Sequence, residues 1–356
     1  MSTDSIQEAQ RQVTICNACR YCEGFCSVFP SLQQIRHFSE GDLTQLANLC
    51  HNCRACHYAC QYSAPHEFNV NIPQSLAKVR VESWQRFARP RILANSFQQH
   101  GVLIGVLLIV VLTLFFYLVG SAPSHPESEG FYQYLSHTIM VLIFAPAFIL
   151  PLTLCADGLR QYWRHVGGEK IRIEHIRGAF KQIASMKNLA GGQGQGCNFE
   201  KEDAYSNARR YWHQATLLGF VLCFASTSTG TLLHYVANMP APYAWYSLPK
   251  LLGVPGGLLL VAGCTGLGWL KCHADRTLGA AQVWGAEMAF IVVLGLSGLT
   301  GLSLYAATGT NVVSGLLAVH LACVMCLFLL LPYSKMVHGF FRLAALVRDE
   351  QTRVSR

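Results

Sequence analysis

Two groups of four closely spaced cysteines lie near the start of this sequence. Both have the pattern Cys-x2-Cys-x2-Cys-x3-Cys, and each cysteine of the first group recurs 34 residues later. Three cysteines at two-residue intervals let one tight loop turn three thiolates toward three corners of an iron-sulfur cubane, while the fourth points away. The repeat therefore predicts two [4Fe-4S] clusters bound by a duplicated unit.

The fourth cysteine of each motif is expected to bind the cluster of the other motif, as in two-cluster proteins with this spacing. Such crossed ligation would tie the two repeats together. The expected ligands of the first cluster are Cys16, Cys19, Cys22 and Cys60. The expected ligands of the second cluster are Cys50, Cys53, Cys56 and Cys26.

Structural zinc is the alternative reading of these cysteines. Zinc sites usually show separated Cys-x2-Cys pairs, or cysteines together with histidines, and the third cysteine of each motif serves no such pattern. Disulfides are a poorer explanation, because the chain has an odd total of 15 cysteines. We therefore expect iron-sulfur clusters.

Four histidines in the apolar part of the chain are candidate haem ligands, because ligating residues in a membrane span are costly and are usually functional. His320 and His338 are 18 residues apart, which on one helix places them on one face and about 27 Å apart. His213 and His234 bracket another apolar stretch. Matched by depth, His213 pairs with His338 and His234 with His320, which predicts one or two b-type haems. Interfacial or hydrogen-bonded histidines are the alternative.

Three further polar residues lie in or near the apolar stretches. His137 is a reserve ligand that would displace His234, whereas His100 is expected to be only interfacial. Glu287 could relay a proton to a quinone. It could also be an ordinary carboxylate near the end of a span.

The elements that must position these groups are mostly membrane helices. The chain has 356 residues, of which 52% are hydrophobic and only 13% are charged, against about a quarter charged in soluble proteins. Six crossings of the membrane are expected, and five are the alternative, because Pro146 and Pro151 interrupt the second stretch. The six stretches able to span a bilayer are 97–120, 134–156, 212–237, 246–270, 284–308 and 312–334.

Lys and Arg predict the orientation of these spans, because cytoplasmic loops carry an excess of both. They gather in the segments that would share one side with both termini. The opposite loops 121–133, 238–245 and 309–311 have none. We therefore expect the cysteine-rich part in the cytoplasm. The net charge of +8 lies beside membrane segments, so no nucleic-acid partner is expected.

The expected fold is all-α, with two domains. Residues 1–92 should form a helical ferredoxin-like domain, because Leu32, Leu43 and Leu46 follow largely helical spacing, with a break at Gly41–Asp42. Residues 93–356 should form a cytochrome b-like membrane domain with a cytoplasmic loop, 157–210. The glycine-rich part of that loop, 191–197, could be a plain flexible linker, a docking segment or a nucleotide site.

The motifs CNACRYCEGFC and CHNCRACHYAC, the six spans and the ending HLACVMCLFLLLPYSKMVHGF together resemble the tricarballylate/citrate utilisation protein B family. The resemblance covers essentially the whole chain. The last span is also similar to that of the cytochrome b subunit of respiratory nitrate reductase, where two histidines at the spacing of His320 and His338 ligate two haems.

The family resemblance implies a protein of the bacterial inner (cytoplasmic) membrane that reoxidises a separate FAD-dependent tricarballylate dehydrogenase. Electrons would pass through the two clusters and b-type haem to quinone. No substrate-oxidising site is visible in the sequence, which predicts an electron-transfer subunit. The alternative is a membrane-embedded iron-sulfur redox sensor without haem or quinone chemistry. A transporter with a regulatory head is a third reading, and the spans show no clear internal repeat that would favour it.

Overall fold

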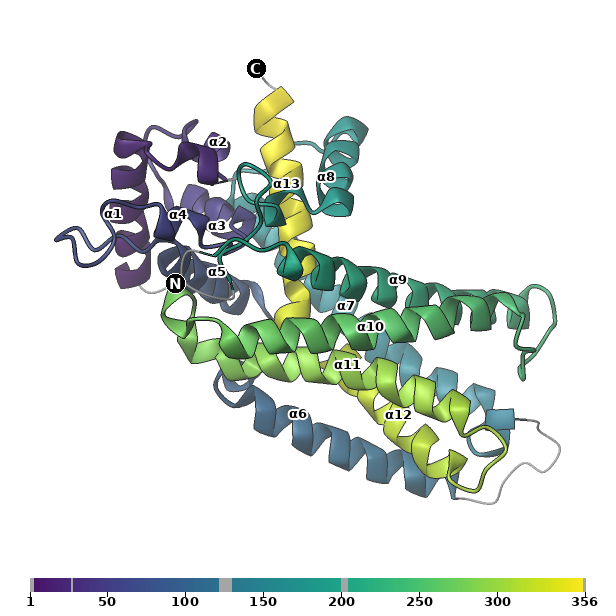
Figure 1. The fold of residues 1–356 in the computed structure, drawn as a ribbon. Helices are drawn as coiled ribbons and strands as arrows, with labels where there is room; N and C mark the ends of the chain where they lie inside the picture. The colour runs from purple at the N-terminus through teal and green to yellow at the C-terminus, as the bar shows by residue number, and fades with distance from the viewer. Residues whose placement is uncertain (1–2, 27, 122–129, 200–203, 355–356) are drawn as a thin grey trace.

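The computed structural model describes residues 3–26, 28–121, 130–199 and 204–354, and it consists of helices joined by short connections (Figure 1). Over these residues there is no strand, and one isolated bridge pairs Cys197 with Ser206. The all-α expectation is confirmed. The helices form a compact head at one end of a bundle of long apolar helices.

The head is built around the cysteine repeats. Its core contains Val13, Leu43 and Val79, all fully buried. Helix α3 begins with a capping box, in which Ser39 and Asp42 satisfy each other's backbone N–H groups. The expected break at Gly41–Asp42 is therefore wrong, because both residues lie in the first turn of α3. The helices of the head are α1 (Thr3–Cys19), α2 (Phe29–Leu32), α3 (Glu40–Leu49), α4 (Ala55–Tyr58) and α5 (Ile72–Phe87).

Each of the six expected apolar stretches forms a long helix, and successive helices run alternately away from the head and back toward it (Figure 1). Among the described residues, five are long and apolar enough to cross a membrane. The sixth, α12, has 17 residues, or about 26 Å at 1.5 Å per residue. The six are α6 (Arg91–Gly120), α7 (His137–His165), α9 (Ala208–Tyr235), α10 (Leu248–His273), α11 (Trp284–Ala306) and α12 (Val313–Leu329).

The end of the chain leaves the bundle and enters the head. After α12, a turn and a short 3-10 helix, Lys335–Val337, lead into α13 (His338–Val354). The expectation that His320 and His338 share one helix face is therefore wrong. Pro332 lies in the break, and proline lacks the N–H that a helix interior needs.

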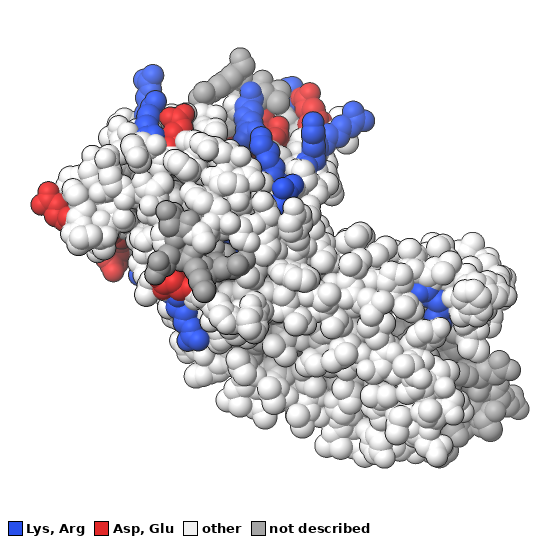
Figure 2. Space-filling view, in the orientation of Figure 1, with Lys and Arg blue, Asp and Glu red and all other residues white. Residues whose placement is uncertain are grey.

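The loop 157–210 is largely ordered. Helix α7 continues to His165, and α8 (Ile173–Ser185) packs beside α13 in the head. For 191–197, the plain flexible linker is wrong, because the Gly192 N–H donates to the Phe25 carbonyl oxygen and Cys197 pairs with Ser206. The docking and nucleotide alternatives for this stretch stay untested. On the face shown in Figure 2, Lys and Arg side chains gather on the head, and the visible surface of the bundle is mainly uncharged.

Candidate iron-sulfur and haem sites

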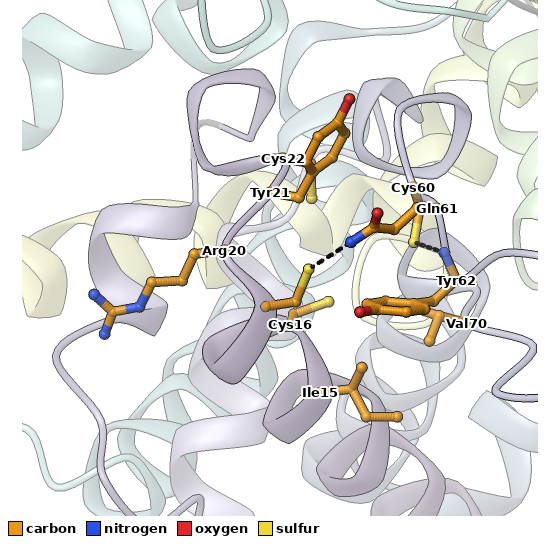
Figure 3. A pocket seen from close by; sticks show the side chains of 10 residues that line it. Ile15, Cys16, Arg20, Tyr21, Cys22, Cys60, Gln61, Tyr62 and Val70 are labelled. Carbon is orange, nitrogen blue, oxygen red and sulfur yellow. Dashed lines mark hydrogen bonds between the residues drawn. The ribbon is translucent and has the colours of Figure 1, made fainter.

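The first cysteine site lies between α1 and the segment after α4. Cys16 and Cys19 are on the last turns of α1, Cys22 precedes a 3-10 helix, and Cys60 follows α4. These four cysteines line one pocket (Figure 3). Cys26, the fourth cysteine of the same motif, is not among its lining residues. The structure thus brings together the four residues expected to hold the first cluster.

The first pocket suits thiolates that are bound to iron. Its other walls include the apolar side chains of Ile15 and Val70. Two N–H groups point at sulfur: the Tyr62 backbone N–H donates to Cys60 Sγ at 3.4 Å, and Gln61 Nε2 donates to Cys19 Sγ at 3.5 Å. Burial and the neighbouring cysteines raise the pKa of Cys22 to about 12, so a free thiolate is disfavoured without a cationic partner.

The second site collects Cys26 with the second motif. The Cys56 thiol donates a hydrogen bond to Cys26, which raises the pKa of Cys56 and lowers that of Cys26. Cys53 is buried and interacts electrostatically with Cys26 and Cys50. Cys50 Sγ accepts from the Asn52 backbone N–H at 3.4 Å. Cys26 thus lies with the second motif and Cys60 with the first, as crossed ligation requires. The ligand sets themselves stay a prediction.

Both motifs reverse direction at the same position. Arg20 and Arg54 directly follow the second cysteine of their motifs, and both have a positive φ, 58° and 69°. Sequence reasoning missed this shared turn, although the identical arginine in both repeats was a signal. In the described part of the chain, no three His, Cys, Asp or Glu side chains converge so as to hold a single metal ion. A cubane does not need such a point, because its four cysteines ligate one cluster of four irons.

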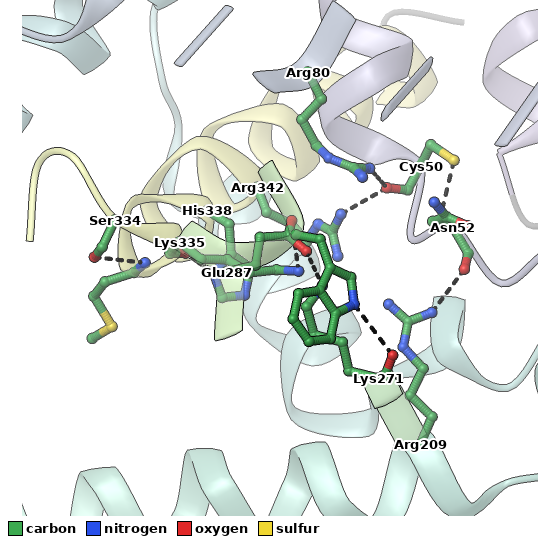
Figure 4. A network of polar contacts seen from close by, with 12 residues as sticks. Cys50, Asn52, Arg80, Arg209, Lys271, Glu287, Ser334, Lys335, His338 and Arg342 are labelled. Carbon is green, nitrogen blue, oxygen red and sulfur yellow. Dashed lines mark hydrogen bonds and ion pairs between the residues drawn. The ribbon is translucent and has the colours of Figure 1, made fainter. Parts of the chain in front are cut away.

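Arginines from α5, α9 and α13 hold the second cysteine loop, residues 50–60 (Figure 4). The Cys50 carbonyl oxygen accepts hydrogen bonds from Arg80 Nη1 and Arg342 Nη2, both at 2.7 Å. The Asn52 carbonyl oxygen accepts from Arg209 Nη1 at 2.8 Å. Burial lowers the pKa of Arg342 to about 9. The hydrogen bonds of the Arg342 guanidinium go to the carbonyl oxygens of Asn48 and Cys50, so its charge is held by backbone oxygens.

Helices α9 and α13, which carry Arg209 and Arg342, also carry the inner histidine pair. His213 lies one turn after Arg209 on α9, and His338 lies one turn before Arg342 on α13. Their ring centroids are 6.0 Å apart and their planes meet at 83°. Two imidazoles on opposite sides of one metal have centroids about 6 Å apart, since each metal–nitrogen bond is about 2 Å.

A second observation fits a ligand between these rings. Nδ1 of His213 is buried and has no hydrogen-bond partner, which calls for an explanation such as a bound ion or cofactor. Nδ1 of His338 hydrogen-bonds the Lys335 carbonyl oxygen, which leaves Nε2 as the available nitrogen. The residues present therefore fit a haem, which His213 and His338 would hold.

The outer histidines are arranged differently from the expected pair. His234 stacks on His137, with ring centroids 4.0 Å apart, and Nδ1 of His234 is buried without a partner. His320 Nδ1 lies 3.0 Å from Thr300 Oγ1. The structure thus places the reserve ligand, His137, beside His234. The pairing of His234 with His320 stays a prediction.

Glu287 lies at the head end of α11 between two lysines. Its carboxylate pairs with Lys271 of α10 and with Lys335 Nζ at 2.9 Å (Figure 4). The group joins three elements beside His338, so a structural role is evident and proton relay stays a prediction. His100 is exposed, and α6 departs from helical geometry there, with φ −123° and ψ 27°.

The fold and the two cysteine sites define a ferredoxin-like helical head joined to a bundle with five candidate membrane spans. Residues 9–86 match the family model described as "Citrate utilization protein B Fer4-like domain", and residues 92–356 match "Citrate utilization protein B". The chain is 41% identical to "Citrate utilization protein B" from Escherichia coli over 350 residues, which is 97% of this chain and 92% of the relative. The chain belongs to the citrate utilization protein B family. No solved structure matches it.

Proposed function

We propose that this protein is a membrane-bound electron-transfer protein of the bacterial inner membrane. It accepts electrons from a cytoplasmic FAD-dependent dehydrogenase, by resemblance tricarballylate dehydrogenase, and delivers them to quinone. When bound, two [4Fe-4S] clusters and one or two b-type haems would supply the one-electron carriers. The Fer4-like head and the family membership support an iron-sulfur role.

One observation carries the proposal: the second cysteine loop is hydrogen-bonded to the two helices that hold the inner histidine pair. Arg342 and Arg209 each reach this loop from a position one helical turn from a histidine. The loop and the histidines are thereby fixed relative to each other. A continuous set of redox-ligand candidates then runs from the head into the apolar bundle.

The two cysteine sites differ in exposure, which gives the route a direction. Tyr21, beside the first pocket, is 65% exposed, and Arg20 is exposed as well. Arg54, the counterpart of Arg20 in the second motif, is only 5% exposed. A flavoprotein would therefore meet the first site. The second site lies inward, against the bundle.

The charges and apolar helices favour this placement in a membrane. A head that carries most Lys and Arg fits the cytoplasmic side. The histidines, by contrast, sit at both ends of the apolar helices. Quinone is a fitting acceptor, because it dissolves in the same apolar layer. Lipid contacts are expected along the exposed apolar faces of the spans, such as Leu103, Val110 and Leu114 of α6.

A reduced-minus-oxidised optical spectrum of the purified full-length protein tests the haem and quinone steps together. A quinol analogue should produce a haem α-band, because electron transfer to quinone is reversible. His213→Ala should diminish the band, whereas His273→Ala, at an exposed histidine, should leave it intact. A wild-type protein with iron-sulfur signals and no quinol-reducible α-band would contradict this route.

A further inference from the structure

The segment 191–199 packs against both cysteine motifs. The Gly192 backbone N–H donates to the Phe25 carbonyl oxygen of the first motif at 3.2 Å, and the Asn198 backbone N–H donates to the Cys53 carbonyl oxygen of the second motif at 2.9 Å. A Cβ on Gly192 would lie 2.1 Å from the Gly24 carbonyl oxygen. Glycine is therefore needed for this close contact with the first motif, and the Asn198 bond ties the end of the segment to the second motif.

Two buried polar residues, Cys197 and Asn198, stand at the end of this segment that reaches the second motif. Cys197 and Asn198 are each 1% exposed. The Cys197 thiol donates to the Leu189 carbonyl oxygen at 3.3 Å, and it belongs to the same buried cluster as Cys53. The Asn198 carboxamide differs, because neither its nitrogen nor its oxygen has a hydrogen-bond partner.

An unpaired buried amide is costly, typically about 1–3 kcal/mol, and it calls for a partner that the protein itself does not provide. The next residue holds Asn198 in place. The Phe199 ring lies between the guanidinium groups of Arg54 and Arg209, at 4.5 Å and 4.3 Å from its centroid. The backbone of Asn198 is thus held at Cys53 by its own hydrogen bond and by the packing of Phe199.

We propose that Asn198 Nδ2 donates an N–H hydrogen bond to a sulfur of the second cluster and raises its reduction potential. The inference rests on the proposed function, because it needs a cluster at this site. Hydrogen bonds to the sulfurs are among the features that set cluster potentials. Asn198 is a positioning and tuning residue, not a cluster ligand.

The first site already has a carboxamide donor of its own, because Gln61 Nε2 donates to Cys19 Sγ at 3.5 Å. Asn198 would give the second cluster the corresponding donor. Its effect is therefore expected on the second cluster alone, and the potential of the first cluster should not depend on Asn198.

The test is an EPR-monitored redox titration of the full-length protein as wild type, Asn198→Leu and Gln193→Ala. Leucine has the same number of side-chain heavy atoms as asparagine, with the same branch point at Cγ, but it has no donor. In Asn198→Leu, the ratio of reduced to oxidised second cluster at a fixed potential should fall about tenfold, which is a 59 mV lower midpoint for a one-electron couple. The first cluster and the Gln193→Ala control, at an exposed side chain of the same segment, should be unchanged.

The possible results distinguish a failure of the Asn198 inference from a failure of the proposed function. Two clusters with unshifted midpoints in Asn198→Leu would overturn the Asn198 inference and leave the proposed function standing. A wild type with no cluster signals would overturn the proposed function itself. If Asn198→Leu loses the second cluster, pulsed EPR of wild type labelled with ¹⁵N in asparagine side chains decides: nitrogen coupling to the cluster supports the bond, and its absence overturns it.

Discussion

The Arg342 guanidinium of α13 donates a 2.7 Å hydrogen bond to the Cys50 carbonyl oxygen of the second cysteine loop. The same guanidinium donates to the Asn48 carbonyl oxygen at 3.2 Å. These bonds join the last helix of the chain to a loop almost 300 residues earlier. A change at Arg342 therefore tests whether α13 holds the second cysteine loop in place.

Arg342→Leu is expected to destabilise the junction. Two backbone oxygens lose a charged donor, and hydrogen bonds to charged groups contribute about 1.5–3 kcal/mol each. The melting temperature of the detergent-solubilised protein should fall, and the second cluster should be lost more readily than the first. Arg177→Leu, at an exposed arginine of α8, is the control and should change the melting temperature little. Equal stability of the two variants would refute the coupling.

Crossed ligation predicts an unusual pattern of variant phenotypes. Cys60→Ala should damage the first cluster, because Cys60 lines the first pocket. Its EPR spectrum should resemble that of Cys16→Ala, although Cys60 belongs to the second motif. Each variant should lose up to about four irons per chain. A Cys60→Ala spectrum that resembles Cys50→Ala instead would show that each motif binds its own cluster.

The inner histidine pair predicts paired losses of haem. His213→Ala and His338→Ala should remove the same haem, because their ring centroids lie only 6.0 Å apart. Haem content per chain, measured by pyridine haemochrome, should fall equally in both. For an outer haem, comparing His137→Ala with His320→Ala identifies the partner of His234. Full haem content in His213→Ala would refute the inner site.

Asp349 predicts a pH dependence of stability. Burial raises the pKa of this carboxyl, which accepts a hydrogen bond from Ser31 and pairs with Arg353 at 2.8 Å. A raised folded-state pKa means that the folded chain binds the proton more tightly than the unfolded chain. The contribution of Asp349 to stability is therefore present at acid pH and is lost as the pH rises through the folded-state pKa.

Asp349→Asn removes this titration and retains an acceptor for Ser31. Melting temperatures measured from pH 4 to pH 7 should show wild type losing stability relative to the variant as the pH rises. Asp4→Asn, at an exposed aspartate, should track wild type throughout. If wild type instead gained on Asp349→Asn with rising pH, the Arg353 ion pair would outweigh burial and the argument would fail.

The sequence predicts the large features of this fold because their signals are local. Each of the six apolar runs coincides with a helix, since apolar length alone marks a spanning helix, although α7 extends to His165, beyond the apolar run that ends at 156. The duplicated cysteines likewise predict which residues gather in the head. The first pocket holds Cys60 with Cys16, Cys19 and Cys22, as the spacing suggests.

The features that sequence reasoning missed depend on contacts between distant segments. Helical periodicity continues through His320 and His338, yet the chain breaks at Pro332 and turns His338 into the head. The role of 191–197 likewise depends on residues that are distant in the sequence. Its glycines suggest a linker, but the Gly192 N–H donates to the Phe25 carbonyl oxygen, and the adjoining Asn198 N–H donates to the Cys53 carbonyl oxygen.

The central claim is that the eight motif cysteines hold two [4Fe-4S] clusters. Iron, acid-labile sulfide and zinc, measured on one anaerobically purified sample of the full-length protein, test it most directly. The account predicts about eight irons and eight sulfides per chain in clusters, with one or two further irons as haem and no stoichiometric zinc. Two zinc ions per chain without labile sulfide would contradict it.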